Sequence, residues 1–189
     1  MGDQLQLWDD TGVVHNVFFA VQPDRAAAAH AEYVAHDFIK SRRMAAKVLP
    51  PERFHVSLFG VGGFSDQLPP AVIEAAEAAA STVSAAPFTV VFDRIASFGG
   101  GRGNRALVLT GSEGVVGLVR FQEAISLAMA KAGVGGRQKQ SFTPHMTLMY
   151  TDETCDIPIE PISWTVDEFV LIDSPFGRSR HDLLGRWPL

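Results

Sequence analysis

The sequence has little cysteine, no long apolar run and no excess of positive charge. Cys155 is the only cysteine among 189 residues, which excludes an internal disulfide framework and a zinc cluster built from cysteines. No apolar run reaches the roughly 18 residues that span a bilayer. Residues 1–8 also lack the basic and apolar regions of a signal peptide. We therefore expect a protein of the reducing cytoplasm, without a membrane partner.

The net charge of −5 argues against broad, non-specific binding of nucleic acid, which requires a basic surface. A local basic cleft is still compatible with the sequence, because residues 37–54 contain five lysines or arginines and only two acidic residues. The content of 47% hydrophobic and 20% charged residues is typical of a globular protein. No linker divides the chain, so residues 1–189 are expected to form a single domain.

Apolar, β-branched segments alternate with alanine-rich ones, and this pattern predicts an α+β fold. Helices are expected over about 24–38, 70–83 and 113–132, and strands over 14–21, 54–61, 88–95, 106–110, 145–150, 164–172 and 182–187. The resulting order, β-α-β-α-β-β-α-β-β-β, favours antiparallel or mixed sheets with helices packed outside them. A glycine-rich loop around Arg102 and Arg105 separates the third and fourth strands.

Two of the six histidines stand in matching surroundings. Only His55 and His145 are followed two positions later by a hydroxyl, in Ser57 and Thr147, and both units lie in segments with strand character. Successive side chains of a strand alternate between its faces. Each unit therefore places an imidazole and a hydroxyl on one face.

A single His-x-Ser or His-x-Thr triplet is common, and a lone strand histidine is more often structural than catalytic. Two matching units in one short chain favour a shared site. One neutral imidazole can deprotonate an attacking water while one imidazolium protonates a departing alkoxide, and two hydroxyls can donate to phosphoryl oxygens. A zinc site is less favoured, because two ligands are too few and the HExxH spacing is absent. We expect neither metal nor cofactor.

The motif residues carry a resemblance to a known family. Residues 18–24, 53–64, 142–150 and 171–189 together resemble the two-histidine phosphoesterase superfamily, specifically its bacterial 2′-5′ RNA ligase-like and cyclic phosphodiesterase branch. The resemblance implies a bilobal, pseudo-two-fold fold in which two antiparallel sheets face a central cleft. It also implies hydrolysis of a 2′,3′-cyclic phosphate of an RNA end or nucleotide to a 2′-phosphate, with 2′-5′ ligation in some members.

Carried over residue by residue, the resemblance gives His55 the role of protonating the leaving 3′-oxygen. His145 would activate the water, and Ser57 and Thr147 would hold the phosphoryl oxygens. No feature of the sequence indicates an obligate protein partner.

The chain departs from the family pattern after each motif. Many relatives have an arginine shortly after the second motif, where Met149 and Tyr150 stand here, and Gly60 replaces a frequent aromatic residue. Candidate substitutes for the missing charge are Arg53, Arg102 and Arg105, and candidate stacking residues are Phe59 and Tyr150, although core packing is the alternative for these aromatics. Two other functions stay open: a groove that binds RNA ends or nucleotides without turnover, and a phosphoesterase for a different cyclic phosphate.

Overall fold

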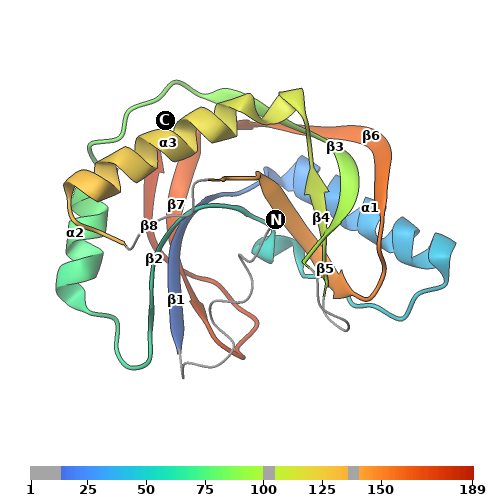
Figure 1. The fold of residues 1–189 in the computed structure, drawn as a ribbon, viewed down its shortest axis with the longest axis horizontal. Coiled ribbons are helices and arrows are strands. Elements are labelled where there is room, and N and C mark those ends of the chain that lie inside the picture. The colour runs from blue at the N-terminus through green and yellow to red at the C-terminus, as the bar shows by residue number, and fades with distance from the viewer. Residues whose placement is uncertain (1–13, 100–104, 136–140) are drawn as a thin grey trace.

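The computed structural model describes residues 14–99, 105–135 and 141–189, and Arg102 therefore lies outside the described residues. The α+β prediction is confirmed (Figure 1). The helices are α1 (Arg25–Arg42), α2 (Pro70–Ala80) and α3 (Val116–Lys131). The strands are β1 (His15–Val21), β2 (Val56–Phe64), β3 (Phe88–Phe98), β4 (Arg105–Thr110), β5 (His145–Thr151), β6 (Asp156–Val166), β7 (Glu168–Pro175) and β8 (Asp182–Pro188).

The strands form two four-stranded antiparallel sheets. Their orders are β2-β1-β7-β8 and β5-β4-β3-β6. Figure 1 shows the two sheets in separate halves of the molecule. The histidine motifs lie at β2 and β5, which are the edge strands of their two sheets. These two edge strands also contact each other. The expected bilobal, pseudo-two-fold arrangement is thus confirmed, and the edge strands bring the motifs to the junction of the two lobes.

One predicted strand, over residues 164–172, is wrong. The chain instead has β6 up to Val166 and β7 from Glu168, and these two strands belong to different sheets. Nothing in the sequence marks the break, because Asp167 has neither glycine nor proline beside it. The first half of β6 contains Pro158 and Pro161, which weakened its strand signal. This crossing carries the chain from the lobe of His145 back to the lobe of His55.

The helices cover the outer faces of the sheets and leave the inner faces to the cleft. Helix α1 begins where the Asp24 carboxylate accepts a hydrogen bond from the backbone N–H of Ala27 at 2.8 Å. Its small buried residues let it lie close to β5 and β6. Helix α3 packs Phe121 against Phe169 of β7, with ring centroids 5.2 Å apart. Among the described residues, no helix is long and apolar enough to cross a bilayer.

Two small apolar clusters lie apart from the main core. One contains Phe18, Ala20, Val170 and Ile172 of β1 and β7, and the other contains Ala96, Ala106 and Val108 of β3 and β4. Their neighbours along each strand, such as Phe19 and Leu107, belong to the main core. Alternation along the strands therefore assigns these clusters to the inner sheet faces, where they form the apolar base of the cleft.

His15 forms a structural hydrogen bond at the start of β1. Its Nδ1 lies 2.6 Å from Oδ2 of Asp173 on β7, and the Asp173 residue is only 3% exposed. The contact between His15 and Asp173 links β1 and β7, the two central strands of this sheet. His15→Ala leaves the buried carboxylate without its partner, and we expect it to lower the free energy of unfolding by about 2 kcal/mol. Urea denaturation beside His30→Ala, which changes an exposed histidine of α1, measures this; equal stability of the two variants would contradict it.

Candidate active site

His55 is fixed by hydrogen bonds on both of its ring nitrogens. The residue follows the short 3-10 turn Pro51–Arg53 and immediately precedes β2. Its Nδ1 lies 2.8 Å from the carbonyl oxygen of Arg53, and its Nε2 lies 3.1 Å from Oγ of Ser57. A carbonyl oxygen only accepts, so Nδ1 carries the proton of the neutral ring. Nε2 is then the basic nitrogen, and it accepts from the Ser57 hydroxyl.

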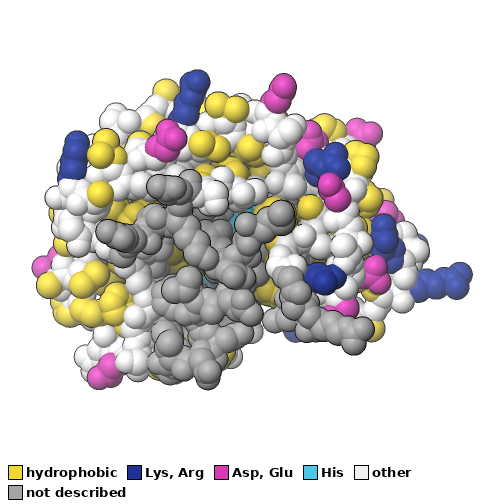
Figure 2. Space-filling model, viewed as in Figure 1, with side chains coloured by type: hydrophobic (Ala, Val, Ile, Leu, Met, Phe, Trp, Pro, Cys, Tyr) yellow, Lys and Arg dark blue, Asp and Glu magenta, His cyan; other side chains and the backbone are white. Residues whose placement is uncertain are grey.

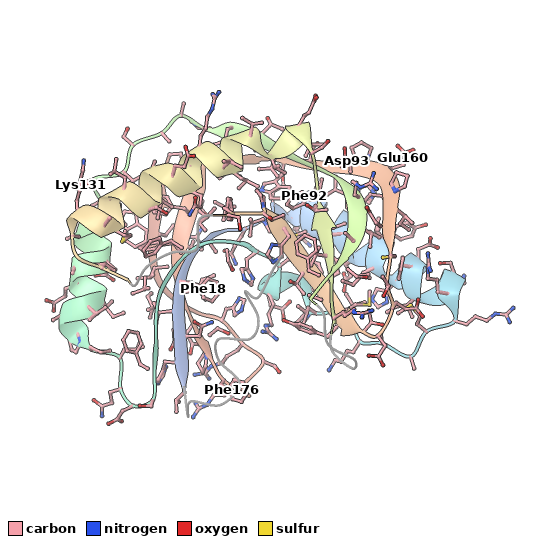
Figure 3. The ribbon with its side chains drawn as sticks, viewed as in Figure 1. Phe18, Phe92, Asp93, Lys131, Glu160 and Phe176 are labelled. Atoms are coloured by element: carbon pink, nitrogen blue, oxygen red, sulfur yellow. The ribbon has the colours of Figure 1, made fainter. Side chains whose placement is uncertain are left out.

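His145 repeats this geometry in the other lobe. Its Nδ1 lies 2.8 Å from the carbonyl oxygen of Thr143, again two residues earlier in the chain. Each histidine is also backed by a phenylalanine at a centroid distance of 5.0 Å, Phe98 for His145 and Phe18 for His55. Phe18 belongs to β1, and its side chain lies on the side of this strand that is nearer the other sheet (Figure 3). Both rings are therefore held in the same tautomer, with Nε2 as the basic nitrogen.

The two motif strands share a β-bulge at the same position. The pairing of β2 with β1 skips Leu58, and the pairing of β5 with β4 skips Leu148. Each of these leucines stands three residues after its histidine. The burial pattern of residues 55–60 is also identical to that of residues 145–150. The pseudo-symmetry of the two halves thus extends to the irregularities of the strands, which are common next to active sites.

The bulge determines which side chains reach the cleft. Ser57 and Thr147 are half-buried on the side of the histidines, as expected from alternation. After the bulge two consecutive side chains enter the core, so Phe59 is only 4% exposed and does not line the cleft. Its candidacy as a stacking residue is therefore corrected in favour of core packing. Tyr150, one position further than Met149, is 40% exposed.

Burial sets the charge of both catalytic candidates. Desolvation lowers the pKa of His55 to about 4; its hydrogen bond to the Arg53 carbonyl opposes this, and the charges of His145 and Arg53 lower it further. Desolvation likewise lowers the pKa of His145, against the hydrogen bond to Thr143. The charge of His145 thus acts on His55, although the two residues belong to different sheets. Near neutral pH both rings of the unliganded protein are neutral.

Arg53 brings the positive charge of this site. Its guanidinium interacts electrostatically with His55 and with Tyr150. Burial raises the pKa of Tyr150, with Arg53 opposing, so the phenol is a neutral hydrogen-bond donor. The charge of Arg53 therefore acts on Tyr150, although the two residues come from different lobes.

The other sequence candidates are placed away from these contacts or outside the structure. The Arg105 guanidinium donates to the hydroxyl of Thr154, near the opposite end of β4 from the residue paired with His145. Arg102 belongs to the part of the chain that the structure does not describe. Within the described ranges, no three His, Cys, Asp or Glu side chains gather closely enough to hold a metal ion.

The structure adds a third histidine, His181, that sequence reasoning missed. Its ring meets His55 edge to face at a centroid distance of 4.9 Å and lies 5.9 Å from the ring of Phe18. Desolvation lowers the pKa of His181 to about 3, with His55 and Arg53 contributing. No motif marks it, because it stands before β8 and reaches His55 only through the sheet pairing.

The depressed histidine pKa values predict acid sensitivity. The unfolded chain binds more protons than the folded one between the unperturbed pKa of 6.5 and the folded values of about 4 for His55 and about 3 for His181. Stability is therefore complete above this window and falls as the pH decreases through it. His181→Phe should reduce the loss between about pH 7 and pH 5 by on the order of 1 kcal/mol. Urea denaturation at both pH values checks this, with the exposed His36→Asn as control; an unchanged loss would contradict it.

Comparisons with known proteins agree with this architecture. Crystal structures of E. coli LigT match the chain with a TM-score of 0.73 and 22% identity for the apo form, and 0.71 and 21% for the complex with 3′-AMP, each covering 94% of this chain and 98% of LigT. The protein TT0787 of Thermus thermophilus matches with a TM-score of 0.72 and 19% identity over 92% of this chain and 97% of its own. No curated protein sequence matches significantly.

These structural likenesses establish the fold, and a family model adds the assignment. The model of the 2′-5′ RNA ligase superfamily matches residues 23–175, which contain both histidine motifs and both bulges. The chain belongs to the 2′-5′ RNA ligase superfamily of two-histidine phosphoesterases.

Proposed function

We propose that this protein is a metal-independent, cytoplasmic phosphodiesterase that opens 2′,3′-cyclic phosphates of RNA ends or nucleotides to 2′-phosphates. The observation that carries the proposal is the mirrored pair of histidines. His55 and His145 each hold Nδ1 on a backbone carbonyl at 2.8 Å and keep Nε2 for acid–base work. A pure binding site has no need of two imidazoles fixed in the same tautomer.

The reaction requires two proton transfers at one phosphorus atom. The basic Nε2 of one histidine takes a proton from water, whose oxygen forms a bond to phosphorus. The bond from phosphorus to the 3′-oxygen breaks, and the protonated second histidine gives its proton to that oxygen. The product keeps the phosphate on the 2′-oxygen. In line with the family resemblance, His55 acts as the acid and His145 as the base.

Substrate binding supplies the charge that the acid needs. Both rings are neutral in the unliganded protein, because burial lowers the pKa of each. A phosphodiester brings one negative charge into the same buried space, which stabilises an imidazolium there. Protonation of the second histidine is disfavoured, because two positively charged imidazoles repel each other. The site therefore becomes active with one proton shared by the pair.

The motif hydroxyls complete the site. Ser57 and Thr147 each stand on the same strand face as their histidine and donate to the non-bridging phosphoryl oxygens as charge develops. Crystal structures of E. coli LigT contain 3′-AMP, ATP, NADP+ or phosphate, which supports a nucleotide or RNA end as the ligand. If the 5′-hydroxyl of a second RNA end replaces water, the same steps give a 2′-5′ linkage.

The charge distribution on the surface favours binding of an RNA end or a nucleotide over binding along a long RNA chain. On the face shown in Figure 2, lysines and arginines are dispersed among acidic side chains, and the chain as a whole has a net charge of −5. Long-range attraction of RNA is therefore weak, and recognition depends on the site itself.

Incubation with a set of nucleoside 2′,3′-cyclic phosphates and short RNAs in the presence of EDTA tests the proposal. We expect turnover that EDTA does not change, with the 2′-phosphate as the product in chromatography beside both isomers. Loss of turnover in EDTA, or a 3′-phosphate product, would contradict it. Tight binding without turnover across the set would instead identify a binding module.

A further inference from the structure

Two polar side chains next to His55 take no part in the reaction described above. The first is Arg53, whose backbone carbonyl orients His55 while its guanidinium interacts with His55, His181 and Tyr150. The second is His181, whose ring contacts His55 and Phe18. Both lie beside His55 in the lobe of β1 and β8, whereas His145 belongs to the facing sheet.

Both side chains hold a buried polar atom without a hydrogen-bond partner. Nε of Arg53 and Nδ1 of His181 are two of the five buried side-chain nitrogen and oxygen atoms of the described residues that lack one. Folded proteins rarely leave such atoms unpaired, and a bound water or ion commonly pairs with them. Both atoms belong to residues that contact His55, which points to a polar group of a ligand near this ring.

The charge of the pair shows which kind of group fits. None of the ion pairs between described residues involves Arg53, so no described carboxylate neutralises its guanidinium. His15, by contrast, has Asp173 as an acidic partner at 2.6 Å. A neutral imidazole still carries one N–H, and an arginine presents a fork of donors that matches phosphate oxygens. An anion with several oxygens satisfies both side chains.

We propose that Arg53 and His181 form a second anion subsite beside the histidine pair, which binds a phosphate group of the substrate other than the one that reacts. The reacting phosphate lies between His55 and His145, while His181 packs on the side of His55 that faces Phe18. The substrate is then a nucleotide with a second phosphate. This phosphate is either the next phosphodiester of an RNA chain or the 5′-phosphate of a mononucleotide.

The turn between β7 and β8 continues from this subsite toward solvent. It leads from His181 to Arg178 and to Phe176, whose side chain is 70% exposed. Phe176 lies at the far end of the turn, away from Phe18 (Figure 3). An exposed aromatic ring on the same turn as Arg178 is suited to stack on a base, as in proteins that bind single-stranded nucleic acid. The turn therefore favours the RNA chain as the source of the second phosphate.

Binding measurements test the subsite without relying on turnover, although the choice of ligands rests on the proposed function. Calorimetry compares adenosine 3′-monophosphate with adenosine 3′,5′-bisphosphate. We expect the wild-type protein to bind the bisphosphate about tenfold more tightly, as one charged hydrogen-bond pair provides. Arg53→Met and His181→Phe, which keep the apolar stem and the ring packing, should reduce this ratio to about two.

Arg120→Gln is the matched control, since it removes an exposed arginine of α3 and should leave the tenfold ratio intact. Urea denaturation confirms that each variant is folded, and His181→Gln replaces His181→Phe if the latter is not. A wild-type ratio near one, or a ratio that persists in folded variants of both Arg53 and His181, would overturn the proposal.

Turnover then distinguishes the two sources of phosphate and separates the two proposals. The substrates are adenosine 2′,3′-cyclic phosphate alone, with a 5′-phosphate, and at the end of an adenosine dinucleotide. A higher kcat/KM for either of the last two supports the subsite and identifies the source; equal values for all three would overturn it. Failure to hydrolyse any of them, with the binding ratio intact, would reject the proposed function but retain the subsite.

Discussion

Replacing either histidine of the pair with asparagine should reduce the kcat/KM for 2′,3′-cyclic nucleotides by about a thousandfold, because general acid–base catalysis is worth roughly 10² to 10⁴ in rate. Asparagine keeps an amide near the position of Nδ1, so the local hydrogen bond to the carbonyl of Arg53 or Thr143 has a substitute. It cannot take up or release a proton near neutral pH. Initial rates of His55→Asn and His145→Asn, measured at equal substrate, give the comparison.

The matched control is His36→Asn, which changes an exposed histidine of α1 and should retain full activity. Combining both substitutions should lower the rate little beyond either single one, because residues that act as a unit are not additive. Full activity in either single variant would contradict the account.

The leaving group separates the acid from the base. In a phosphodiester with a 4-nitrophenyl group, the 4-nitrophenolate leaves without being protonated. The variant that lacks the general acid should therefore recover much of its activity on this substrate. If His55 is the acid, His55→Asn recovers and His145→Asn does not. The guanidinium of Arg53 disfavours the charged form of His55, which makes this assignment worth testing directly.

The hydroxyl substitutions carry the second-largest expected effect. Thr147→Val removes the donor while keeping the β-branched shape, and we expect kcat to fall by about one hundredfold with a smaller change in KM. The reason is that the hydroxyl stabilises charge that develops on the phosphoryl oxygens only as the transition state forms. Steady-state kinetics beside Thr147→Ser, which restores a hydroxyl, provide the measurement and its control.

Ser57→Ala should have a comparable or larger effect. Ser57 also donates to Nε2 of His55 at 3.1 Å, so its loss frees that nitrogen as well as removing a phosphate contact. The pH profile of kcat/KM should therefore move for Ser57→Ala and stay in place for Thr147→Val. Wild-type kinetics in both variants would show that the hydroxyls are only structural.

The sequence predicted those parts of the molecule that local pattern controls. Strand alternation placed His55 with Ser57 and His145 with Thr147, because neighbouring residues of one strand decide which face each side chain occupies. Asp24 was expected to cap a helix, and α1 begins at Arg25 with Asp24 as its N-cap, since capping is also a local effect. The two-sheet architecture itself came from the family resemblance.

Features that depend on pairing between distant segments were missed. The bulges at Leu58 and Leu148 exist only relative to β1 and β4, and they decide that Phe59 enters the core while Tyr150 stays half exposed. His181 reaches His55 because β8 pairs with β7, which pairs with β1. The change of sheet at Asp167 has no signal in composition. Such long-range effects are invisible to residue spacing.

Two histidines from the two sheets are expected to act together on one phosphate group. Nuclear magnetic resonance of the protein with ¹⁵N-labelled histidine, titrated with adenosine 2′-monophosphate, tests this claim most directly. We predict that the Nε2 signals of His55 and His145 shift together as the ligand saturates, and that one of them reports a protonated ring at neutral pH. Saturation with only one signal shifting, or with neither, would contradict the shared site.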